Sequence, residues 1–506
     1  MFNLTIEKFQ KIVKNLNTKE KKVVIPIYKE VVVDTETPVS LFLKVAKKEK
    51  FAYLLESAET SLQWGRYSFI SFLPYLILYS KNKDVVVEEK NIKRRLKCDP
   101  FEKIREILKC FVLYEDHIRG ATIPRFFGGL VGYIGYENIS LIEPKIKIPL
   151  KDEFKDLPDI YLTFNQVVLI FDHYLNKLNI VYLAIFDKNS NVQKSYSEAI
   201  STIEQVHKTI KSTISLPTEL SYKKTISSIK EYTFNIPRNE FIKIVNKAKE
   251  YIYAGDIIQV VISRRFSKLT QAEPFDIYRA LRLINPSPYM FYLNFDNLVL
   301  IGSSPEILVR KENDFVETRP IAGTRPRGKT EEEENLLEKE LISSQKENAE
   351  HIMLVDLARN DIGKIAEYST VNLPQFRIIE KFSHVMHIVS SVKGKLKKGL
   401  DCIDVLKACF PAGTVSGAPK VRAMEIIYEL EKETRGPYAG AVGYFSLTGN
   451  MDMAITIRTI IYKDKKVYIQ TGAGIVADSL ANKEFEETLN KAKALLLAVE
   501  IAENKN

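Results

Sequence analysis

The sequence predicts an α/β protein of the α+β type, with large, mostly antiparallel sheets and helices on the outside. Short apolar strands recur in hairpin pairs, which favours antiparallel pairing. Amphipathic helices separate these groups of strands and can cover a sheet. No repeat of about 20 to 50 residues is visible, which argues against a solenoid or a propeller.

Composition and charge narrow the class of protein. The chain has 506 residues, 45% hydrophobic and 27% charged, as in soluble globular proteins. This length allows two to four domains, or fewer if a large α/β core takes up much of the chain. The net charge of +10 comes mostly from scattered lysines, without an aromatic and basic recognition motif. We therefore predict no nucleic-acid partner. No run of about 18 apolar residues exists, which predicts no membrane span.

The N-terminus and the cysteines predict a cytoplasmic protein. Residues 1–22 lack the apolar core of a secretory peptide and are typical of a short amphipathic helix. The cysteines form no CxxC pair, and four in a chain of this length indicate no disulfide framework. We expect reduced thiols at Cys98, Cys110, Cys402 and Cys409.

The first part of the chain consists of short strands with a few helices. It ends in a hairpin pattern, with strands at 167–171 and 178–186. The polar segment that follows has apolar residues at helical spacing until Pro217 ends the pattern. We predict three parts: an N-terminal region over 1–187, a polar connecting segment over 188–237, and a second unit over 238–506.

The second unit opens with an amphipathic helix over 239–256, which Gly255 ends. Long helical stretches at about 331–366 and 480–503 interrupt and close its strands. The strands are expected in hairpin groups: LVLIG (298–302) with ILVRK (307–311) and FVETR (315–319), YFSL (444–447) with AITIRTII (454–461), and TIRTIIY (456–462) with VYIQTGAGIV (467–476).

Two helical segments carry carboxylates three residues apart. Glu347 and Glu350 form one pair, and Glu484 and Glu487 form the other. This spacing places each pair on one helix face, and two such faces could together supply oxygen ligands for Mg²⁺. The alternative is solvated surface glutamate, the usual role of a lone ExxE and our interpretation of the run at 331–334.

Glycine clusters at 321–328, 410–420 and 470–479 follow predicted strands. Glycine lets backbone N–H groups approach an anion, which makes the clusters candidate carboxylate cradles. Tight turns are the alternative for any single cluster. Neither the P-loop nor the dinucleotide-binding spacing is present.

Arg458 falls within the apolar segment 454–461. A buried guanidinium is costly unless it is paired, so Arg458 is a candidate fork for a ligand carboxylate. An internal ion pair with Asp452 is equally possible. His384 and His387 form the sole close histidine pair in the sequence, and a core or surface role is favoured for HxxH alone. No cysteine lies in a GxCxG turn, so the chain lacks that glutaminase nucleophile.

Taken in order, eleven segments from AGDIIQVVISRRF (254–266) to EFEETLNKA (484–492) resemble the chorismate-binding enzymes. They include IGSSPEILVR, RPIAGTRPRG, HVMHIVSSVKG, PAGTVSGAPK, GPYAGAVGYFS and QTGAGIVADS, and they span about residues 238–497. LLESAE (54–59) followed by GRYSFI (65–70) is similar to the large subunits of anthranilate synthases. The resemblance implies the chorismate-binding fold and conversion of chorismate and ammonia to anthranilate and pyruvate.

The resemblance also implies roles for individual residues. Glu350 and Glu487 would hold Mg²⁺, with Glu347 and Glu484 nearby. His387, rather than His384, matches the catalytic histidine. The implied substrate-binding residues are Gly323, Thr324, Thr414, Tyr438, Arg458, Gly472, Ala473, Gly474 and Lys491.

Two positions separate members of the family. Relatives that use water carry lysine where this chain has Gln259, and glutamine cannot act as a general base, which favours ammonia as the nucleophile. Aminodeoxychorismate synthases commonly have lysine in place of Ala322, so the main rival activity is disfavoured. We hypothesise that Glu306 protonates the leaving hydroxyl and that His387 assists proton movement during loss of pyruvate.

The resemblance finally implies regulation and a partner. L-Tryptophan would inhibit by binding at Glu56, Ser57, Pro288, Tyr289 and Met290, whose structural alternative is a strand end packed on a proline-rich turn. Ammonia would come from a separate glutamine amidotransferase subunit in a heterodimer or heterotetramer. A catalytically silent, tryptophan-responsive homologue is the rival from another class. Ala481 stands where many relatives have proline, which leaves both glutamate spacings intact.

Overall fold

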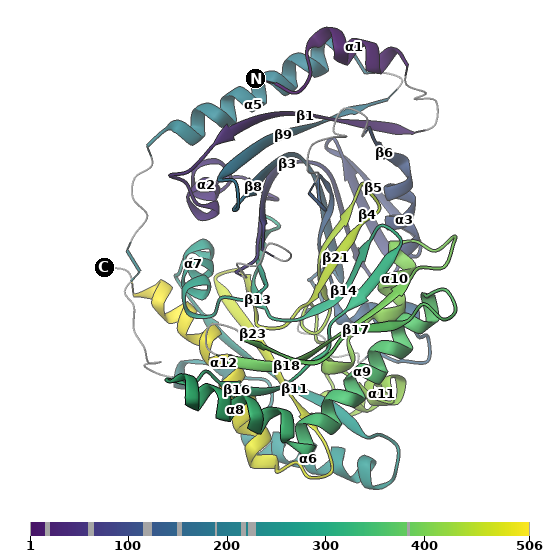
Figure 1. The fold of residues 1–506 in the computed structure, drawn as a ribbon, viewed down its shortest axis with the longest axis vertical. Coiled ribbons are helices and arrows are strands. Elements are labelled where there is room, and N and C mark those ends of the chain that lie inside the picture. The colour runs from purple at the N-terminus through teal and green to yellow at the C-terminus, as the bar shows by residue number, and fades with distance from the viewer. Residues whose placement is uncertain are drawn as a thin grey trace.

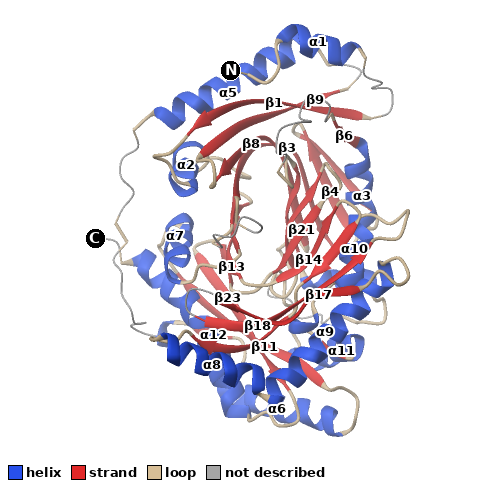
Figure 2. Cartoon of the chain, viewed as in Figure 1, coloured by secondary structure: helices blue, strands red, loops and turns tan. Residues whose placement is uncertain are grey.

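The computed structural model describes residues 2–15, 21–58, 65–114, 124–148, 154–187, 190–213, 219–220, 229–381 and 385–504. Strands occupy the interior and helices the outside, as the sequence predicted (Figure 1 and Figure 2). The mixed α/β class with mostly antiparallel pairing is confirmed. Pro217 and His384 lie outside the described residues.

The N-terminal part of the fold, up to residue 213, is built around long strands that pack with helices in two buried clusters, one on each face. Its helices are α1 (Ile6–Lys14), α2 (Pro38–Val45), α3 (Pro100–Cys110), α4 (Ile139–Ile142) and α5 (Val192–Lys211). Its strands are β1 (Lys22–Val32), β2 (Tyr53–Glu56), β3 (Tyr67–Lys81), β4 (Asp84–Glu89), β5 (Ile92–Lys97), β6 (Phe111–Leu113), β7 (Gly129–Ile134), β8 (Ile160–Asp172) and β9 (Lys177–Phe186). The predicted hairpin is β8 with β9, and α5 packs across β9 and β1.

The C-terminal part contributes the remaining elements. Its helices are α6 (Arg238–Tyr253), α7 (Pro274–Ile284), α8 (Glu331–Ser343), α9 (Gln345–Ile365), α10 (Cys402–Cys409), α11 (Lys420–Glu431) and α12 (Ala481–Glu503). Its strands are β10 (Thr233–Phe234), β11 (Gln259–Leu269), β12 (Tyr289–Asn294), β13 (Leu298–Ser304), β14 (Ile307–Glu312), β15 (Phe315–Thr318), β16 (Ile321–Pro326), β17 (Asn372–Lys381), β18 (Val385–Lys395), β19 (Gly417–Ala418), β20 (Ala441–Ser446), β21 (Met451–Ile455), β22 (Thr459–Lys463) and β23 (Lys466–Ile475). Short 3₁₀ turns lie at Tyr136–Asn138, Ile229–Glu231 and Gly413–Val415.

Of the strand pairs predicted for the second unit, three form and one was wrong. β14 pairs with β15, β20 with β21, and β22 with β23. β13 does not pair with β14; it lies between β12 and β22, while β14 lies between β15 and β21. The corner between β13 and β14 bonds to Ile455: the Ser304 hydroxyl donates to the Ile455 carbonyl, and the Ile455 N–H donates to the Glu306 carbonyl.

Two further sequence predictions change in detail. The long helical stretch at 331–366 is two helices, because Ser344 breaks it and its side chain accepts a hydrogen bond from the N–H of Glu347 in the first turn of α9. Arg458 is not inside a strand. It lies between β21 and β22 with φ of +50°, so its side chain leaves the regular alternation of the strands.

The N-terminal and C-terminal parts share sheets and a core. β2 pairs with β12, and β7 pairs with β20 along its whole length. The largest buried cluster combines Leu78 and Val131 with Val442 and Tyr444. The division into 1–187, 188–237 and 238–506 therefore stays a proposal about sequence regions, because these strands pair across it.

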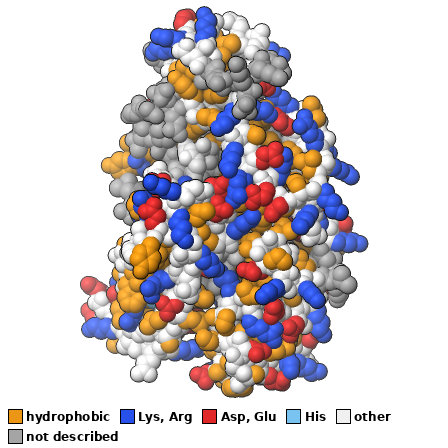
Figure 3. All heavy atoms as spheres, turned by 90° about the vertical axis from the view of Figure 1, so that its right-hand side faces the viewer, with side chains coloured by type: hydrophobic (Ala, Val, Ile, Leu, Met, Phe, Trp, Pro, Cys, Tyr) orange, Lys and Arg blue, Asp and Glu red, His pale blue; other side chains and the backbone are white. Residues whose placement is uncertain are grey.

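The cysteines, the surface charges and the helix lengths complete the description of the fold. The four cysteines are free thiols, and Cys402 and Cys409 are buried. Acidic and basic side chains are interspersed on the face that carries α3 and α10 (Figure 3), where Arg105 of α3 lies 2.6 Å from Asp404 of α10. Within the described ranges, no helix combines the length and apolar character needed to cross a bilayer.

Candidate active site

A cavity of about 550 Å³ lies between α9 and α12 on one side and the ends of β11, β16, β18 and β23 on the other. It brings together all but one of the predicted catalytic, metal and substrate residues, although they are spread over more than 200 positions of sequence. Those in its wall are Gln259, Glu306, Gly323, Thr324, Glu347, Glu350, His387, Thr414, Tyr438, Arg458, Gly472, Gly474, Glu484, Glu487 and Lys491.

Ala473 is the exception. Its side chain lies on the opposite face of β23, in a core cluster with Ile262 and Ile475. Gly472 and Gly474 face the cavity and permit close approach of other side chains. A Cβ atom on Gly472 would lie 2.8 Å from the Tyr438 hydroxyl, and one on Gly474 would lie 2.7 Å from Nε2 of Gln259.

Wall residues that sequence reasoning missed include Lys346, Val261, Val415 and Gln470. Oε1 of Gln259 and Oε1 of Gln470 are buried and have no hydrogen-bond partner among the described residues. Buried polar atoms are rarely left unpaired in native proteins, so these two oxygens favour a polar ligand in the cavity. Val261 and Gln470 could have been predicted from strand alternation, because each lies two residues from a predicted site residue, Gln259 or Gly472, and so shares its face of the strand.

The predicted carboxylates come from α9 and α12. The pKa of Glu350 is raised by burial and by the neighbouring charges of Glu347 and Glu487. The pKa of Glu484 is raised by burial and by Glu487. This mutual repulsion favours a cation between the helices. Lys491 supplies one positive charge, because its Nζ lies 2.6 Å from Oε1 of Glu487.

The chemistry of these carboxylates is compatible with Mg²⁺, a cation that often keeps coordination positions free for water or substrate. In the described part of the chain, no three His, Cys, Asp or Glu side chains come close enough together to hold a metal ion. Mg²⁺ commonly takes only one or two protein carboxylates and completes its shell with water and substrate oxygens. Two carboxylates such as Glu350 and Glu487 would meet that smaller requirement, and the described residues form no closed cage of protein ligands.

Glu306 lies half-buried at the corner between β13 and β14. Burial raises the pKa of Glu306 to about 7, with Thr414 and Lys491 opposing the shift. Near neutral pH a large share of Glu306 is therefore protonated. A carboxylic acid with a pKa near the working pH is suited to general acid catalysis.

His387 projects from β18 and has a defined tautomer. Its Nδ1 lies 2.8 Å from the carbonyl oxygen of Gly323 and 3.1 Å from Oγ1 of Thr324. A carbonyl oxygen only accepts, so Nδ1 carries the hydrogen. Burial lowers the pKa of His387, which keeps the ring neutral and leaves the lone pair on Nε2.

Arg458 does not use the ion pair that the sequence left open. Asp452 pairs with Arg310 at 2.7 Å, whereas Nη1 of Arg458 donates to the carbonyl of Lys491 at 2.7 Å. Burial lowers the pKa of Arg458. With the neighbouring Tyr438 in the same wall, the guanidinium is placed to bind an anionic group in the cavity.

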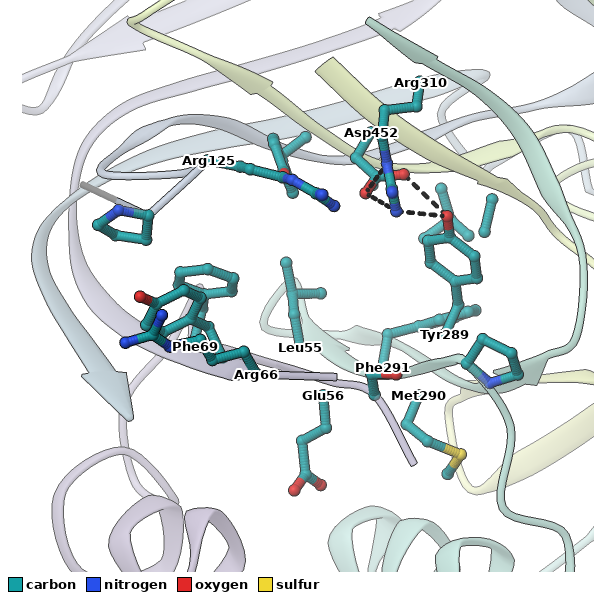
Figure 4. A pocket seen from close by; sticks show the side chains of 18 residues that line it. Leu55, Glu56, Arg66, Phe69, Arg125, Tyr289, Met290, Phe291, Arg310 and Asp452 are labelled. Atoms are coloured by element: carbon teal, nitrogen blue, oxygen red, sulfur yellow. Dashed lines mark hydrogen bonds and ion pairs between the residues drawn. The ribbon is translucent and has the colours of Figure 1, made fainter. Parts of the chain in front are cut away.

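A second cavity of about 260 Å³ lies between β2, β12, β20 and β21 (Figure 4). Glu56, Ser57, Pro288, Tyr289 and Met290 are all in its wall. Figure 4 shows that Glu56 and Met290 point away from the cavity, whereas Leu55 and Tyr289 lie on its side of the strands. Strand alternation explains this, because neighbouring residues face opposite sides. Glu56 instead accepts hydrogen bonds from Tyr278 and Arg282 of α7.

Charged and aromatic side chains complete the second cavity. Sequence reasoning did not find Arg66, Phe69, Arg125, Arg310, Tyr444 or Asp452. Tyr289 donates to Asp452 at 3.0 Å, and Arg310 bonds to both residues, so one end of the cavity is a fixed polar network.

The fold and the first cavity define an enzyme of chorismate chemistry. The sequence pattern of the family described as chorismate binding enzyme matches residues 57–497, and the chain belongs to that family.

Comparison with individual relatives narrows this class. The chain is 51% identical to anthranilate synthase component 1 of Aquifex aeolicus, over 99% of this chain and 98% of the relative. It is 47% identical to anthranilate synthase component 1 of Acetivibrio thermocellus, over 99% of each chain. Among solved structures it resembles anthranilate synthase component I of Streptococcus pneumoniae, with a TM-score of 0.74, 36% identity, and coverage of 92% of this chain and 99% of that one.

Proposed function

We propose that this chain is the chorismate-aminating component of an anthranilate synthase, which converts chorismate and ammonia to anthranilate, pyruvate and water. Full-length relatives with that name support the activity. One observation carries the choice of nucleophile: a single cavity contains the acid Glu306 and the non-basic Gln259. Such a cavity can protonate a leaving hydroxyl and has no lysine at position 259 to deprotonate water.

The first step is amination. Ammonia, oriented by the unpaired Oε1 of Gln259, forms a bond to ring carbon 2 while the bond from carbon 4 to its hydroxyl breaks. Glu306 donates the proton with which that hydroxyl leaves as water, and a proton of the bound ammonium restores the acid. Tyr438 and Arg458 hold the enolpyruvyl carboxylate, and Lys491 lies beside the ring carboxylate.

The second step is loss of pyruvate. Nε2 of His387 accepts the proton from carbon 2, the bond from carbon 3 to the enolpyruvyl oxygen breaks, and the ring becomes aromatic. The departing enolpyruvate takes up one proton at its methylene carbon and becomes pyruvate, and the protonated His387 gives up that proton, directly or through solvent, so the base is restored. The Nδ1–H of His387, donated to Gly323, keeps Nε2 facing the ring as a base.

Glu350 and Glu487 would hold Mg²⁺, with Glu347 and Glu484 nearby. When bound, the ion would supply Lewis-acid chemistry at the ring carboxylate of chorismate. The raised pKa of Glu350 supports this assignment, because burial and the charges of Glu347 and Glu487 disfavour its ionised form, and a bound cation would offset both effects.

The absent glutaminase nucleophile supports a separate amidotransferase subunit as the source of ammonia, in a heterodimer or heterotetramer. For the second cavity we propose L-tryptophan as an inhibitory ligand. Its size, aromatic wall and polar network of Arg310, Asp452 and Tyr289 suit a zwitterion with an apolar side chain.

The activity is tested by incubating the purified chain with chorismate, Mg²⁺ and an ammonium salt at mildly alkaline pH, with products identified by chromatography and mass. We expect anthranilate and pyruvate, with glutamine unable to replace ammonium. If aminodeoxychorismate is the final product, the chain has the rival activity of an aminodeoxychorismate synthase. If chorismate stays unchanged, the result would favour the hypothesis that the chain is a catalytically silent, tryptophan-responsive homologue.

A further inference from the structure

A buried arginine lies behind the wall of the first cavity. The Arg435 side chain is completely buried, and its guanidinium pairs with Glu431 of α11 at 2.6 Å. Its other N–H groups donate to the carbonyls of Val415, at 2.8 Å, and Val261, at 2.7 Å. Val261 and Val415 both line the cavity. Arg435 therefore joins two walls of the cavity without entering it.

The same network reaches a third wall through Glu431. Its Oε1 accepts hydrogen bonds from the N–H of Ser263, at 2.7 Å, and from the Ser263 hydroxyl, at 3.0 Å. That hydroxyl accepts a hydrogen bond from Nε2 of Gln470 at 2.8 Å. Gln470 lines the cavity, so its orientation depends on the buried ion pair.

Glu137 enters this network from the N-terminal part of the chain. It lies in the 3₁₀ turn after β7 and is 4% exposed. Its Oε1 accepts from the backbone N–H of Arg435 at 2.7 Å, and its Oε2 accepts from that of Gly436 at 2.9 Å. The carbonyl of Gly436 in turn accepts from the N–H of Tyr136 at 2.8 Å.

Glu137 is thus bound to the backbone just ahead of a substrate residue. Gly436 has φ of +60°, and Tyr438 follows two positions later in the cavity wall. The Tyr438 hydroxyl sits close against Gly472, so a small displacement of the loop at 435–438 would move it relative to the ligand. Each oxygen of Glu137 accepts from a backbone N–H of this loop, and Oε1 also accepts a longer hydrogen bond from the Tyr428 hydroxyl of α11 at 3.5 Å.

We propose that Glu137 is a positioning residue for the first cavity: by holding the backbone of Arg435 and Gly436, it sets Tyr438 and the walls joined by Arg435 in the shape that binds chorismate. The inference deepens the proposed function and rests on it. Glu137 does not line the cavity itself, so its effect is exerted through Tyr438.

The test uses Glu137→Gln in the full chain. The amide retains one acceptor and places an NH₂ group against the other backbone N–H, which repels it. We expect KM for chorismate to rise about tenfold and kcat to change less than about threefold, because the lost contact positions a binding group. Glu137→Asp keeps both acceptor oxygens and should lie between the wild type and the Gln variant.

A matched control is Glu89→Gln. Glu89 is a partly buried carboxylate of the N-terminal part that is bonded to Lys22 and Tyr75, and it does not line the cavity. It should lower the melting temperature without changing KM. An equal rise of KM in Glu89→Gln would reduce Glu137 to a general stabiliser and overturn the proposal, as would an unchanged KM in Glu137→Gln.

A double-mutant cycle with Tyr438→Phe tests the route. If Glu137 acts through Tyr438, the two effects on KM will not multiply, whereas multiplicative effects would refute that route.

Calorimetric titration with chorismate measures binding without turnover. If the wild type forms no anthranilate, the proposed function fails, and weaker chorismate binding by Glu137→Gln would still support the positioning role. Should Glu137→Gln not fold, the Asp variant takes its place in every measurement.

Discussion

Nδ1 of His387 lies 2.8 Å from the carbonyl oxygen of Gly323, and this single contact fixes which ring nitrogen can accept a proton. The contact joins β18 to β16, the strand that carries the glycine cluster predicted to bind the substrate. The strand pairing that forms the cavity thus also determines the tautomer of its base.

His387→Ala should block the second step more than the first. We expect anthranilate formation to fall by about 100-fold or more, the usual contribution of a general base, with accumulation of the aminated intermediate. Product analysis by chromatography and mass separates the two compounds. His207→Gln is the control, because His207 lies on α5 and does not line the cavity. A proportional loss of both compounds would remove His387 from the second step.

Glu306 predicts how activity depends on pH. The acid works in its protonated form, and its pKa is raised to about 7, so the protonated fraction is nearly complete below pH 6 and falls tenfold per pH unit well above pH 7. At a fixed concentration of free ammonia, kcat/KM for chorismate should follow that fall. A profile that stays flat to pH 9 would contradict the assignment.

Glu306→Gln removes the proton and nearly preserves the shape of the side chain. We expect turnover to fall by about 100-fold to 10,000-fold, with little change in chorismate binding, and steady-state kinetics beside calorimetry measure both. Equal turnover in the variant would refute the role of Glu306 as the acid.

Mg²⁺ should stabilise the wild type through Glu350 and Glu487. Added MgCl₂ is expected to raise the melting temperature, because a ligand that binds only the folded state stabilises it, and to give a heat of binding. Glu350→Gln and Glu487→Gln should lose both responses. The control is Glu338→Gln on α8, which is bonded to Lys381 outside the cavity. The assignment fails if the variants bind Mg²⁺ as the wild type does.

The second cavity makes a prediction from side-chain direction. Leu55→Trp should fill it and abolish the heat of L-tryptophan binding, because Leu55 lies on the cavity side of β2 (Figure 4). Met290→Leu should leave the dissociation constant within about twofold, since that side chain points away and the substitution nearly conserves volume. Absence of any heat with the wild type would reject tryptophan as the ligand.

The sequence predicted individual helices and strands better than it predicted which strands pair with each other. Regular spacing identified α9 and α12 and placed their glutamates on one face each, because helical periodicity is local. The pairing of β13 with β14 was wrong because Ile455, about 150 residues away, binds the corner between them. Arg458 was assigned to a strand because the sequence of this apolar segment does not indicate the positive φ of +50° that the residue adopts.

Motifs in the sequence predicted the residues of the candidate site. They did not predict the residues that hold those side chains in place. Ala473 belonged to a correct glycine cluster, yet the alternation of β23 turns its side chain into the core. Glu137 carries no motif, and its partners are backbone N–H groups 298 and 299 residues further along the chain. Such contacts depend on tertiary structure, and a single sequence holds no local signal for them.

The pairing of β7 with β20 has a consequence for how the polypeptide matures. One edge of β7 pairs with β8, which follows soon in the chain. On the other edge Gly132 lies opposite Gly443, so that edge waits for about 310 further residues before its partner β20 exists. Long-range pairing of this kind folds slowly, because the intervening chain must be closed into a loop first. The nascent N-terminal part therefore leaves the ribosome with an unpaired strand edge, and its folding can finish only near the end of synthesis.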